Sequence, residues 1–465
     1  MRTPHLETPL EDFIVHPVRT DDDRYAFEEW LQYEPFLGID TETEGLAFHD
    51  EVRLVQLANK NEAWVFDPKK HPEIIAEITQ GHFDLVAHNA TFDALALAKD
   101  PEKILTVCED TQIMAHLLDP KTTQDGGIGH GLKPLCDVHL GAGAINGQTA
   151  LKMRFKDLGL TLSNGFRNID LWDETYVIYA GLDAGLTIRL HEILAPRIKE
   201  EGLSDIYEFE RHVSRICAGM SARGIKVDMD HTTLTYRQLE DEELKATREV
   251  SIYGVENVNS TSQVAEALIA RGVELTEKTN SGKWKVDKSV LNSLDDPVAE
   301  LVQQAKSAGK AKESWVKPIA QEAFLNGDDR VHPRIKTLGA KTGRMSVERF
   351  QQLPTDDHRI RGCLIPDDGY TLLAVDYSQV EVRVMAYLAG EENLIQAFKG
   401  GEDIHSSIAA RLYGDDFTPQ QRGLAKAAIF AKLYGAGPKK LSETTGVSQN
   451  QAKKVMNGLN RSFPR

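Results

Sequence analysis

Long hydrophobic runs, a secretion signal and closely spaced cysteines are all missing from this sequence. No run of about 18 apolar residues occurs, so no membrane-spanning helix is expected. The first residues lack the apolar segment of a secretion signal. The absence of any C-x-x-C pair argues against a disulfide framework and a zinc knuckle. These absences favour a protein of the reducing cytoplasm. The four cysteines are Cys108, Cys136, Cys217 and Cys363.

Motifs of ATP-driven motors and of dinucleotide enzymes are absent as well. The sequence contains no P-loop, and no G-x-G-x-x-G follows an apolar strand. It also contains no internal repeat and no low-complexity tract. With 465 residues, 41% hydrophobic and 27% charged, the chain has the composition of a globular protein of about three domains.

The net charge of −17 argues against a nucleic-acid partner, but the charges are unevenly distributed. Residues 330–465 contain 20 Lys and Arg against 14 Asp and Glu, a net charge of +6, whereas residues 1–329 carry −23. Charges more than about 10 Å away are screened at physiological salt. A cationic end can therefore bind phosphates beside an acidic body. A chance imbalance between solvated surfaces is an equally open alternative.

The hydrophobic pattern divides the chain into three zones. From about residue 20 to 200, short apolar runs alternate with helical stretches, which predicts an α/β domain. From 203 to about 326 the pattern is helical. From 331 onwards strands and helices are mixed again. The sequence therefore predicts a multidomain protein that combines α/β and α+β parts.

Four acids in the first zone stand where a metal site could form. Asp40 and Glu42 follow an apolar run and lie two positions apart, so they share one face of a predicted strand. Asp93 follows another apolar run, at a strand–helix junction. Tyr179 and Asp183 lie four positions apart, one above the other on a predicted helix.

Carboxylates that converge in this way repel one another unless a cation joins them. Mg²⁺ and Mn²⁺ prefer such oxygen ligands. Four acids could hold two divalent ions about 3.5–4 Å apart, the arrangement used for phosphoryl displacement, and Tyr179 would orient the attacking water. Solvated acids at a strand end are the alternative for Asp40 and Glu42. The three segments together disfavour that alternative.

The pattern Asp-x-Glu, Asn-x-x-x-Asp and Tyr-x-x-x-Asp, in this order, resembles the DEDD 3′→5′ exonucleases of the subgroup with tyrosine. The resemblance implies a ribonuclease H-like exonuclease domain over residues 21–202, preceded by an N-terminal extension over 1–20. It implies hydrolysis of a 3′-terminal nucleotide with release of a nucleoside monophosphate. The residues implied as catalytic are Asp40, Glu42, Asp93, Tyr179 and Asp183, of which the four acids would bind the metal ions.

A second candidate site lies in the third zone. Asp376 ends the apolar run 371–375, which is predicted to be a strand. Two cations followed by two aromatic residues, advancing about 40° at each step of a helix, suit a triphosphate with its base stacked beyond it. A surface helix with Phe430 packed into the core is the alternative. The four residues, at four-residue steps, are Arg422, Lys426, Phe430 and Tyr434.

Residues 331–465 resemble the palm and fingers of family A DNA polymerases, the group of bacterial DNA polymerase I and its phage relatives. The helical region 203–330 would then be the thumb, which binds duplex phosphates. The segments that carry the resemblance are 341–346 and 350–354 (primer–template binding), 376–383 (motif A), 403–406 (start of the fingers) and 422–435 (motif B).

This resemblance implies roles for single residues. Asp376 would bind Mg²⁺ or Mn²⁺ in a second two-metal site, and Glu381 would exclude ribonucleotides by crowding the 2′ position. Arg344 and Arg383 would contact the primer–template. The residues implied in binding the incoming dNTP are Glu381, His405, Arg422, Lys426, Phe430 and Tyr434.

Motif C, a His-Asp-Glu turn expected after motif B, is missing, because the one His-Asp-Glu, 49–51, lies in the exonuclease zone. We therefore expect an incomplete or split chain that acts mainly as a metal-dependent 3′-5′ exonuclease, with a second chain as the possible source of motif C. We expect no 5′-nuclease domain ahead of the exonuclease, as in phage-type members. The expected location is the cytoplasm, that of the host if the protein is phage-encoded.

Two other functions remain open at this point. A stand-alone exoribonuclease of the ribonuclease D type shares the acidic motifs, but it has no reason to carry Asp376, Glu381 and motif B. A non-catalytic DNA-binding subunit has no reason to keep all four exonuclease acids. The expected partners are primer–template DNA, single-stranded 3′ ends and dNTPs, and no membrane.

Overall fold

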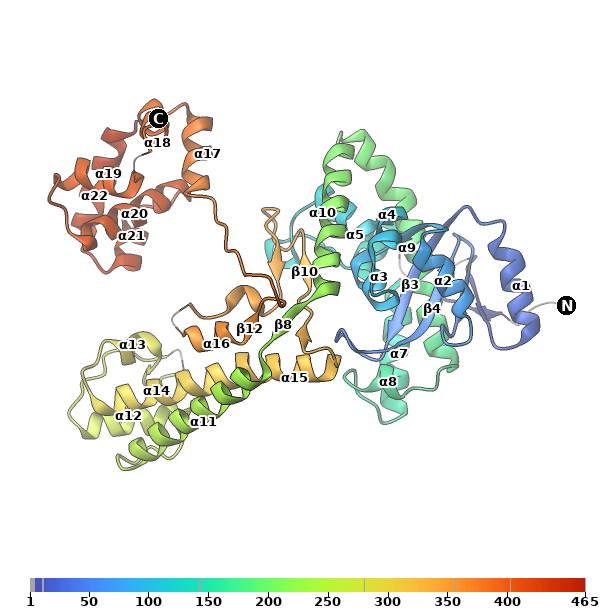
Figure 1. The fold of residues 1–465 in the computed structure, drawn as a ribbon, viewed down its shortest axis with the longest axis horizontal. Helices are drawn as coiled ribbons and strands as arrows, with labels where there is room; N and C mark the ends of the chain where they lie inside the picture. The colour runs from blue at the N-terminus through green and yellow to red at the C-terminus, as the bar shows by residue number, and fades with distance from the viewer. Residues whose placement is uncertain are drawn as a thin grey trace. The chain divides into compact units, whose positions relative to one another are not determined.

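The computed structural model describes residues 5–10, 12–141, 144–279, 281–355, 357–401 and 403–464. Its elements are drawn in Figure 1. The chain divides into two units, Met1–Thr371 and Leu372–Arg465. None of the helices in the described ranges is long and apolar enough to cross a membrane.

The first unit is built on a seven-stranded mixed sheet with the order β1-β2-β5-β4-β3-β6-β7. The interior strand β3 pairs antiparallel with β4 and parallel with β6. The predicted α/β character of this zone is confirmed. The strands are β1 Leu6–Glu7, β2 Ile14–Pro17, β3 Phe36–Thr43, β4 Val52–Ala58, β5 Glu62–Phe66, β6 Asp84–Ala87 and β7 Cys108–Asp110.

Two of these strands lie within residues 1–20, for which the sequence predicts an extension ahead of the domain. Strand β2 instead pairs parallel with β5, and β1 pairs antiparallel with β2. Val15 is fully buried against Gly181 of the helix that covers the sheet. These strands are too short for their pattern to be recognised in the sequence. The boundaries predicted at 202/203 and 330/331 remain predictions.

Two apolar cores lie on opposite faces of this sheet. Leu37 and Ile39 of β3 belong to one core, which also contains Phe27 of α1. The other core is formed around the long helix α9, Glu174–Glu200, which packs across β3, β4 and β5. The remaining helices of this part are α1 Asp21–Leu31, α2 Pro72–Gln80, α3 Ala90–Leu97, α4 Glu102–Val107, α5 Thr111–Leu118, η1 Thr123–Asp125, α6 Leu132–Leu140, α7 Ala144–Asp157 and α8 Gly165–Asn168.

The next part of the first unit is helical, as the sequence predicts. Helix α10 ends at Gly224, whose φ of +67° favours glycine, and Ser260 caps α12 by accepting a hydrogen bond from the Gln263 amide. A π-helical turn, η2, joins α14 directly to α15. The helices are α10 Ser204–Arg223, α11 Met229–Ser251, α12 Thr261–Ala270, α13 Lys288–Asn292, α14 Pro297–Ala311, η2 Lys312–Val316 and α15 Lys317–Asn326.

Short strands complete the first unit. One three-stranded sheet has the order β12-β8-β9, and β10 forms an antiparallel pair with β11. The first residues of the third zone therefore fold with the first unit. The elements are β8 Ile225–Val227, β9 Arg330–Val331, β10 Ile335–Lys336, β11 Ser346–Val347, η3 Phe350–Gln352, α16 His358–Gly362 and β12 Leu364–Ile365.

The second unit is helical in all its described elements and has two small apolar cores. The strand predicted for residues 371–375 is wrong. That segment is extended but unpaired, and Leu373 and Val375 are 82% and 83% exposed. A strand needs a neighbour for its backbone hydrogen bonds, and no strand in the described ranges pairs with this segment. The helices are α17 Val380–Ala389, α18 Glu392–Lys399, α19 Ile404–Tyr413, α20 Pro419–Leu433, α21 Pro438–Thr445 and α22 Gln449–Ser462.

The close packing of α9 on β3 can be tested at Gly38. A Cβ atom at this position would collide with the backbone carbonyl oxygen of Ala184 in α9. Gly38→Ala should therefore lower the free energy of unfolding of the first unit by about 1–3 kcal/mol, measured by urea denaturation.

Gly219 of α10 is the matched control, because a Cβ there meets nothing within 4 Å. Gly219→Ala should be neutral or should stabilise the helix by up to about 1 kcal/mol. A Gly38→Ala variant as stable as the wild type would contradict the close approach of α9 to β3.

Candidate active site: a buried carboxylate cluster

Alternation along β3 selects which side chains face α9. Leu37 and Ile39 point into the core on the far face of the sheet, so Gly38, Asp40 and Glu42 face the helix. Because Gly38 has no side chain, the backbone of α9 approaches the strand closely. The two acids are therefore held directly opposite the helix.

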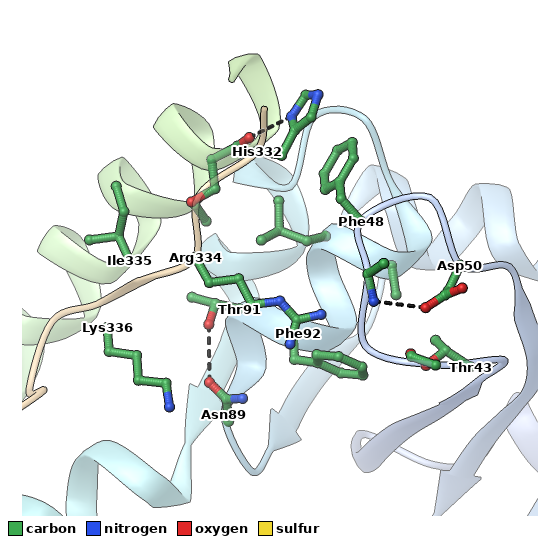
Figure 2. A pocket seen from close by; sticks show the side chains of 16 residues that line it. Thr43, Phe48, Asp50, Asn89, Thr91, Phe92, His332, Arg334, Ile335 and Lys336 are labelled. Carbon is green, nitrogen blue, oxygen red and sulfur yellow. Dashed lines mark hydrogen bonds between the residues drawn. The ribbon is translucent and has the colours of Figure 1, made fainter. Parts of the chain in front are cut away.

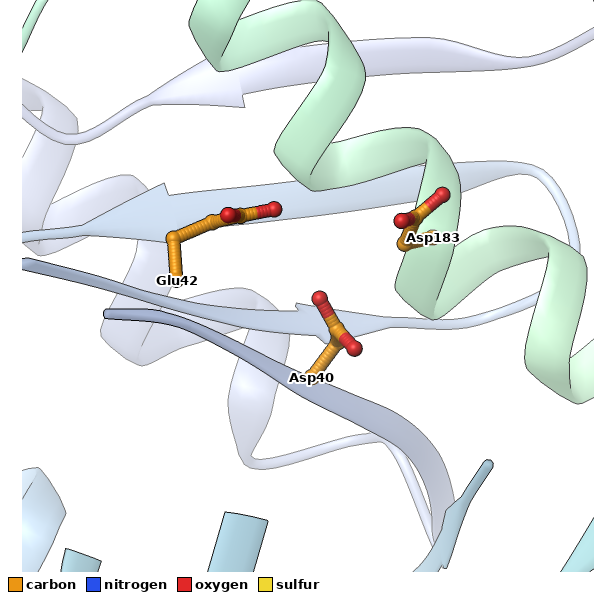
Figure 3. Close-up of side chains that lie close together, drawn as sticks. All are labelled: Asp40, Glu42 and Asp183. Carbon is orange, nitrogen blue, oxygen red and sulfur yellow. The ribbon is translucent and has the colours of Figure 1, made fainter. Parts of the chain in front are cut away.

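Asp183 completes a group of three acids. It is a buried residue of α9. Asp40, Glu42 and Asp183 each offer a carboxylate oxygen, and these oxygens all lie within 4.8 Å of one another. Figure 3 shows Asp40 and Glu42 pointing toward the helix that carries Asp183. An all-oxygen donor set at this spacing fits a hard divalent cation such as Mg²⁺ or Mn²⁺.

Asp93 lies next to this group but is held by a different contact. It is in the first turn of α3 and is 3% exposed. The hydroxyl of Thr41 donates a hydrogen bond of 2.7 Å to its Oδ1. Thr41 lies between Asp40 and Glu42 on β3, and its side chain points to the other face of the strand. The structure thus gathers three of the four predicted acids and fixes the fourth beside them.

Burial makes the acids of this site hard to ionise without a cation. It raises the pKa of Asp40, and the charge of Glu42 raises that pKa further. Burial also raises the pKa of Glu42, to about 8. The pKa of Asp93 is raised by burial and by the charge of Asp40, against the hydrogen bond from Thr41. A bound divalent cation would favour the ionised carboxylates.

A lysine that the sequence interpretation overlooks lies inside this group. Lys133, in the first turn of α6, contacts Oδ1 of Asp183 with its ammonium group. The same nitrogen lies 4.9 Å from the centre of the Tyr179 ring. Burial lowers the pKa of Lys133 to about 8, although Asp40 and other neighbours favour its charged form. No spacing pattern distinguishes this lysine from others in the sequence.

Tyr179 lies one helical turn before Asp183 on α9. Burial raises its pKa, and the charges of Glu42 and Asp40 raise it further. The phenol therefore stays protonated at neutral pH and can donate a hydrogen bond, but it cannot serve as a base.

Asp110 is a structural acid that the sequence interpretation also overlooks. Its carboxylate accepts hydrogen bonds from the amides of Asn89 and Ala90 at the start of α3, at 3.1 and 2.9 Å. It also caps α5 through the amide of Gln112. Asp110 thereby fixes the beginning of the helix that carries Asp93. Its place directly before a helix is an N-cap signal that could have been recognised.

A cavity of about 130 Å³ continues from the end of β3 (Figure 2). Thr43, the last residue of β3, is one of its lining residues. The guanidinium of Arg334, another lining residue, lies 5.1 Å from the centre of the Phe92 ring. The rings of Phe48 and His332 are stacked with their centres 3.8 Å apart. Cationic and aromatic groups therefore line a space at the end of β3.

In the second unit, the structure brings together residues of the predicted motifs A and B. The hydroxyl of Tyr434 donates to the two carboxylate oxygens of Glu381, both at 3.0 Å. Arg422 of α20 donates to Asp403 at 2.7 and 3.1 Å, and Asp403 caps the helix that begins with Ile404 and His405. Helices α17, α19 and α20 are thus linked through polar side chains.

The four-residue stripe on α20 divides between surface and core. Lys426 is exposed, whereas Phe430 packs against an apolar cluster that contains Val382 and Ile408. The ring of His405 lies 6.1 Å from that of Phe430, and its pKa is lowered by burial. Phe430 is thus partly buried at the edge of this apolar cluster, while its role in nucleotide binding stays a prediction.

The remaining predicted polymerase residues are exposed. Asp376 lies in the unpaired segment before α17 and belongs to no group of three potential metal ligands in the described ranges. Arg383 donates to the carbonyl of Ser378 at 2.8 Å and lies over the ring of Phe398. Arg344, in the first unit, lies in the loop between β10 and β11.

Comparison with known proteins agrees with both parts of this description. A family model described as DNA polymerase family A matches residues 231–465, and one described as 3′-5′ exonuclease matches residues 15–199. The DNA polymerase of Mycobacterium phage D29 is 31% identical over 97% of this chain and 78% of its own length. That of Mycobacterium phage L5 is 33% identical over 97% of this chain and 77% of its own.

More distant proteins show the same relationship. The thermostable DNA polymerase I of Thermus aquaticus is 32% identical over 62% of this chain and 36% of its own length. The POL domain of Pol1 from M. smegmatis, solved in complex with DNA primer-template and dNTP, has the same fold, with a TM-score of 0.70 and 21% identity over 96% of this chain and 76% of that one. With a polymerase model over half of its length and phage polymerases similar along nearly all of it, the chain belongs to the family A DNA polymerases and carries their 3′-5′ exonuclease domain.

Proposed function

We propose that Asp40, Glu42, Asp183 and the adjacent Asp93 bind two divalent metal ions and that this centre removes the 3′-terminal nucleotide of DNA. The observation that carries the proposal is the meeting of three acids from β3 and α9 within 4.8 Å. Membership of a family with an exonuclease domain supplies the reaction. Bound Mg²⁺ or Mn²⁺ would lower the pKa of a water and stabilise the charge that develops on the phosphate.

The protein side chains have separate tasks in this proposal. Asp40 and Glu42 hold their positions because β3 is paired on both sides in the sheet and α9 packs over it. The hydroxyl of Thr41 orients Asp93. Tyr179, which stays protonated, donates a hydrogen bond that orients the attacking water rather than removing its proton.

The cavity at the end of β3 suits the end of a single strand. A base can stack on an aromatic ring such as Phe92, and a guanidinium such as that of Arg334 can contact a phosphate or a base. Both groups line the cavity together with Thr43, which follows directly after Glu42. We propose that this cavity receives the terminal nucleotides of a single-stranded 3′ end.

For the second unit we propose binding of a deoxynucleoside triphosphate. Arg422 and Lys426 lie one turn apart on α20, where a guanidinium and an ammonium can contact the same polyphosphate. Glu381, with Tyr434, and the neighbouring His405 and Phe430 would complete the nucleotide site. Asp376 would contribute one ligand to the metal ions of nucleotidyl transfer, and Arg344 and Arg383 would contact the primer–template.

Removal of two acids tests the exonuclease. Asp40→Ala combined with Glu42→Ala should lower the rate of 3′-end trimming by about 10³-fold or more, because the ions lose two of their carboxylate ligands. Trimming is measured on a labelled single-stranded DNA in Mg²⁺ by gel electrophoresis. DNA binding, measured by fluorescence anisotropy, should be retained.

The matched control changes Asp21 and Asp22, two exposed acids of α1, to alanine and should leave trimming unchanged. A folding check separates the catalytic role from a structural one. Because burial raises the pKa values of Asp40 and Glu42, their charged forms destabilise the metal-free fold at pH 8. The double variant should therefore melt no lower than wild type in EDTA. Undiminished trimming by it would rule out the metal site.

Primer extension tests the second unit. One carboxylate neutralises at most one of the four positive charges of two Mg²⁺ ions, and Asp376 joins no acidic cluster in the described ranges. We expect residues 1–465 alone to extend a primer only weakly, at least about 100-fold more slowly than a two-carboxylate site allows. The assay uses the Asp40→Ala, Glu42→Ala variant, so that trimming cannot erase the product. Robust synthesis by it would contradict this expectation.

The kind of nucleic acid that is trimmed tests the substrate. A polymerase-linked exonuclease should process DNA 3′ ends, whereas an exoribonuclease of the ribonuclease D type should prefer RNA. We expect wild-type protein to shorten a DNA strand faster than an RNA strand of the same sequence, both measured in one reaction with two labels. Preferential shortening of the RNA would refute the DNA assignment.

A further inference from the structure

The exonuclease site already contains a positive charge of the protein itself. The side chains of Lys133 and Asp183 are only 11% and 10% exposed, and they contact each other through Nζ and Oδ1. The ammonium group also lies over the face of Tyr179. A buried ion of this kind is stable only when it is paired. Lys133 is therefore the counter-charge of Asp183 in the structure described here.

The fold fixes this lysine in place. Helix α6 packs against α9, and the residues that follow Lys133 in α6, Leu135 and Cys136, are buried in the core around α9. The thiol of Cys136 lies 3.8 Å from the carbonyl oxygen of Leu186 in α9. The α6 backbone is thus anchored next to Asp183. The packing of α6 against α9 therefore directs the side chain of Lys133 into the site, unlike that of a mobile surface lysine.

Two cations cannot use the same carboxylate equally well. Asp183 is one of the three acids whose oxygens are spaced for a divalent ion, and its Oδ1 contacts Lys133. An ion that binds there must displace the ammonium group or share the carboxylate with it, against the repulsion between like charges in a site of low dielectric constant.

We propose that Lys133 is the resident counter-ion of the exonuclease site, which pairs with Asp183 when no metal is bound and competes with the divalent ion for it. This inference rests on the proposed exonuclease function. Lys133 is a positioning residue in this scheme: it acts through Asp183 and Tyr179 and sets the metal affinity. It keeps the acids paired in the metal-free protein and makes the affinity for the ion lower than the carboxylates alone would give.

Titration with Mn²⁺ by calorimetry, at one fixed pH and on the full chain, tests the proposal. Lys133→Gln removes the competing charge and should tighten Mn²⁺ binding about tenfold. Lys133→Arg keeps the charge and can hold Asp183 with two parallel hydrogen bonds, so it should weaken Mn²⁺ binding several-fold. The expected order of affinity is Gln, then Lys, then Arg.

Thermal melting gives a second readout that does not depend on activity. In EDTA, Lys133→Gln should melt at a lower temperature than wild type, because the acids lose their counter-charge, and added Mn²⁺ should raise its melting temperature more than that of wild type. Lys152→Gln, at an exposed position of α7, is the matched control and should behave as wild type in both measurements.

The result that overturns the proposal is an unchanged or reversed order of Mn²⁺ affinities in the three proteins. If Lys133→Gln does not fold, the Lys133→Arg variant alone tests the proposal. Mn²⁺ binding by this variant that is as tight as in wild type, or tighter, contradicts competition between Lys133 and the metal ion. Failure of the exonuclease assignment looks different. In that case wild type and the Asp40→Ala, Glu42→Ala variant bind Mn²⁺ equally, whatever residue is at position 133.

Discussion

The contact on which the proposed exonuclease site depends is the close approach of α9 to the interior strand β3. It is possible because Gly38 presents no side chain to the helix at Ala184. Asp183, which directly precedes Ala184, is thereby brought opposite Asp40 and Glu42. The large apolar core around α9 supplies the free energy that holds these like charges together.

This arrangement creates an electrostatic conflict that the fold resolves in three ways. Burial raises the pKa values of Asp40 and Glu42, the hydroxyl of Thr41 donates a hydrogen bond to Asp93, and Lys133 pairs with Asp183. A stable metal-free fold and a strong affinity for cations make opposite demands on the same acids. The balance between them is set by groups that are not themselves metal ligands.

The sequence predicts the parts of this protein that follow from local pattern. The period of two in β3 predicts that Asp40 and Glu42 share a face, and the spacing of Tyr179 and Asp183 predicts one helical face. Motif order adds the family, which the comparisons confirm. Lys133 is different, because its place in the site depends on how α6 packs against α9, a long-range contact that leaves no local pattern.

The wrong strand at residues 371–375 has a related cause. An apolar run predicts that a segment will be buried, but it does not identify the strand or helix that covers it. In the described ranges that partner is absent, and the segment is extended and exposed. Conversely, β1 and β2 have weak patterns, but they form because β5 offers β2 a free edge and the α9 helix covers Val15.

The π-helical turn between α14 and α15 has a consequence for how the two helices are phased. Upstream of it, Val302 and Ala305 face the core beside α11; downstream, Ile319 and Ala323 face the small sheet that contains β8 and β9. Each residue turns an α-helix by about 100°. The extra residue in the wide turn thus acts as an angular spacer, which lets the continuous helical segment from α14 to α15 present its apolar stripe to two different neighbours.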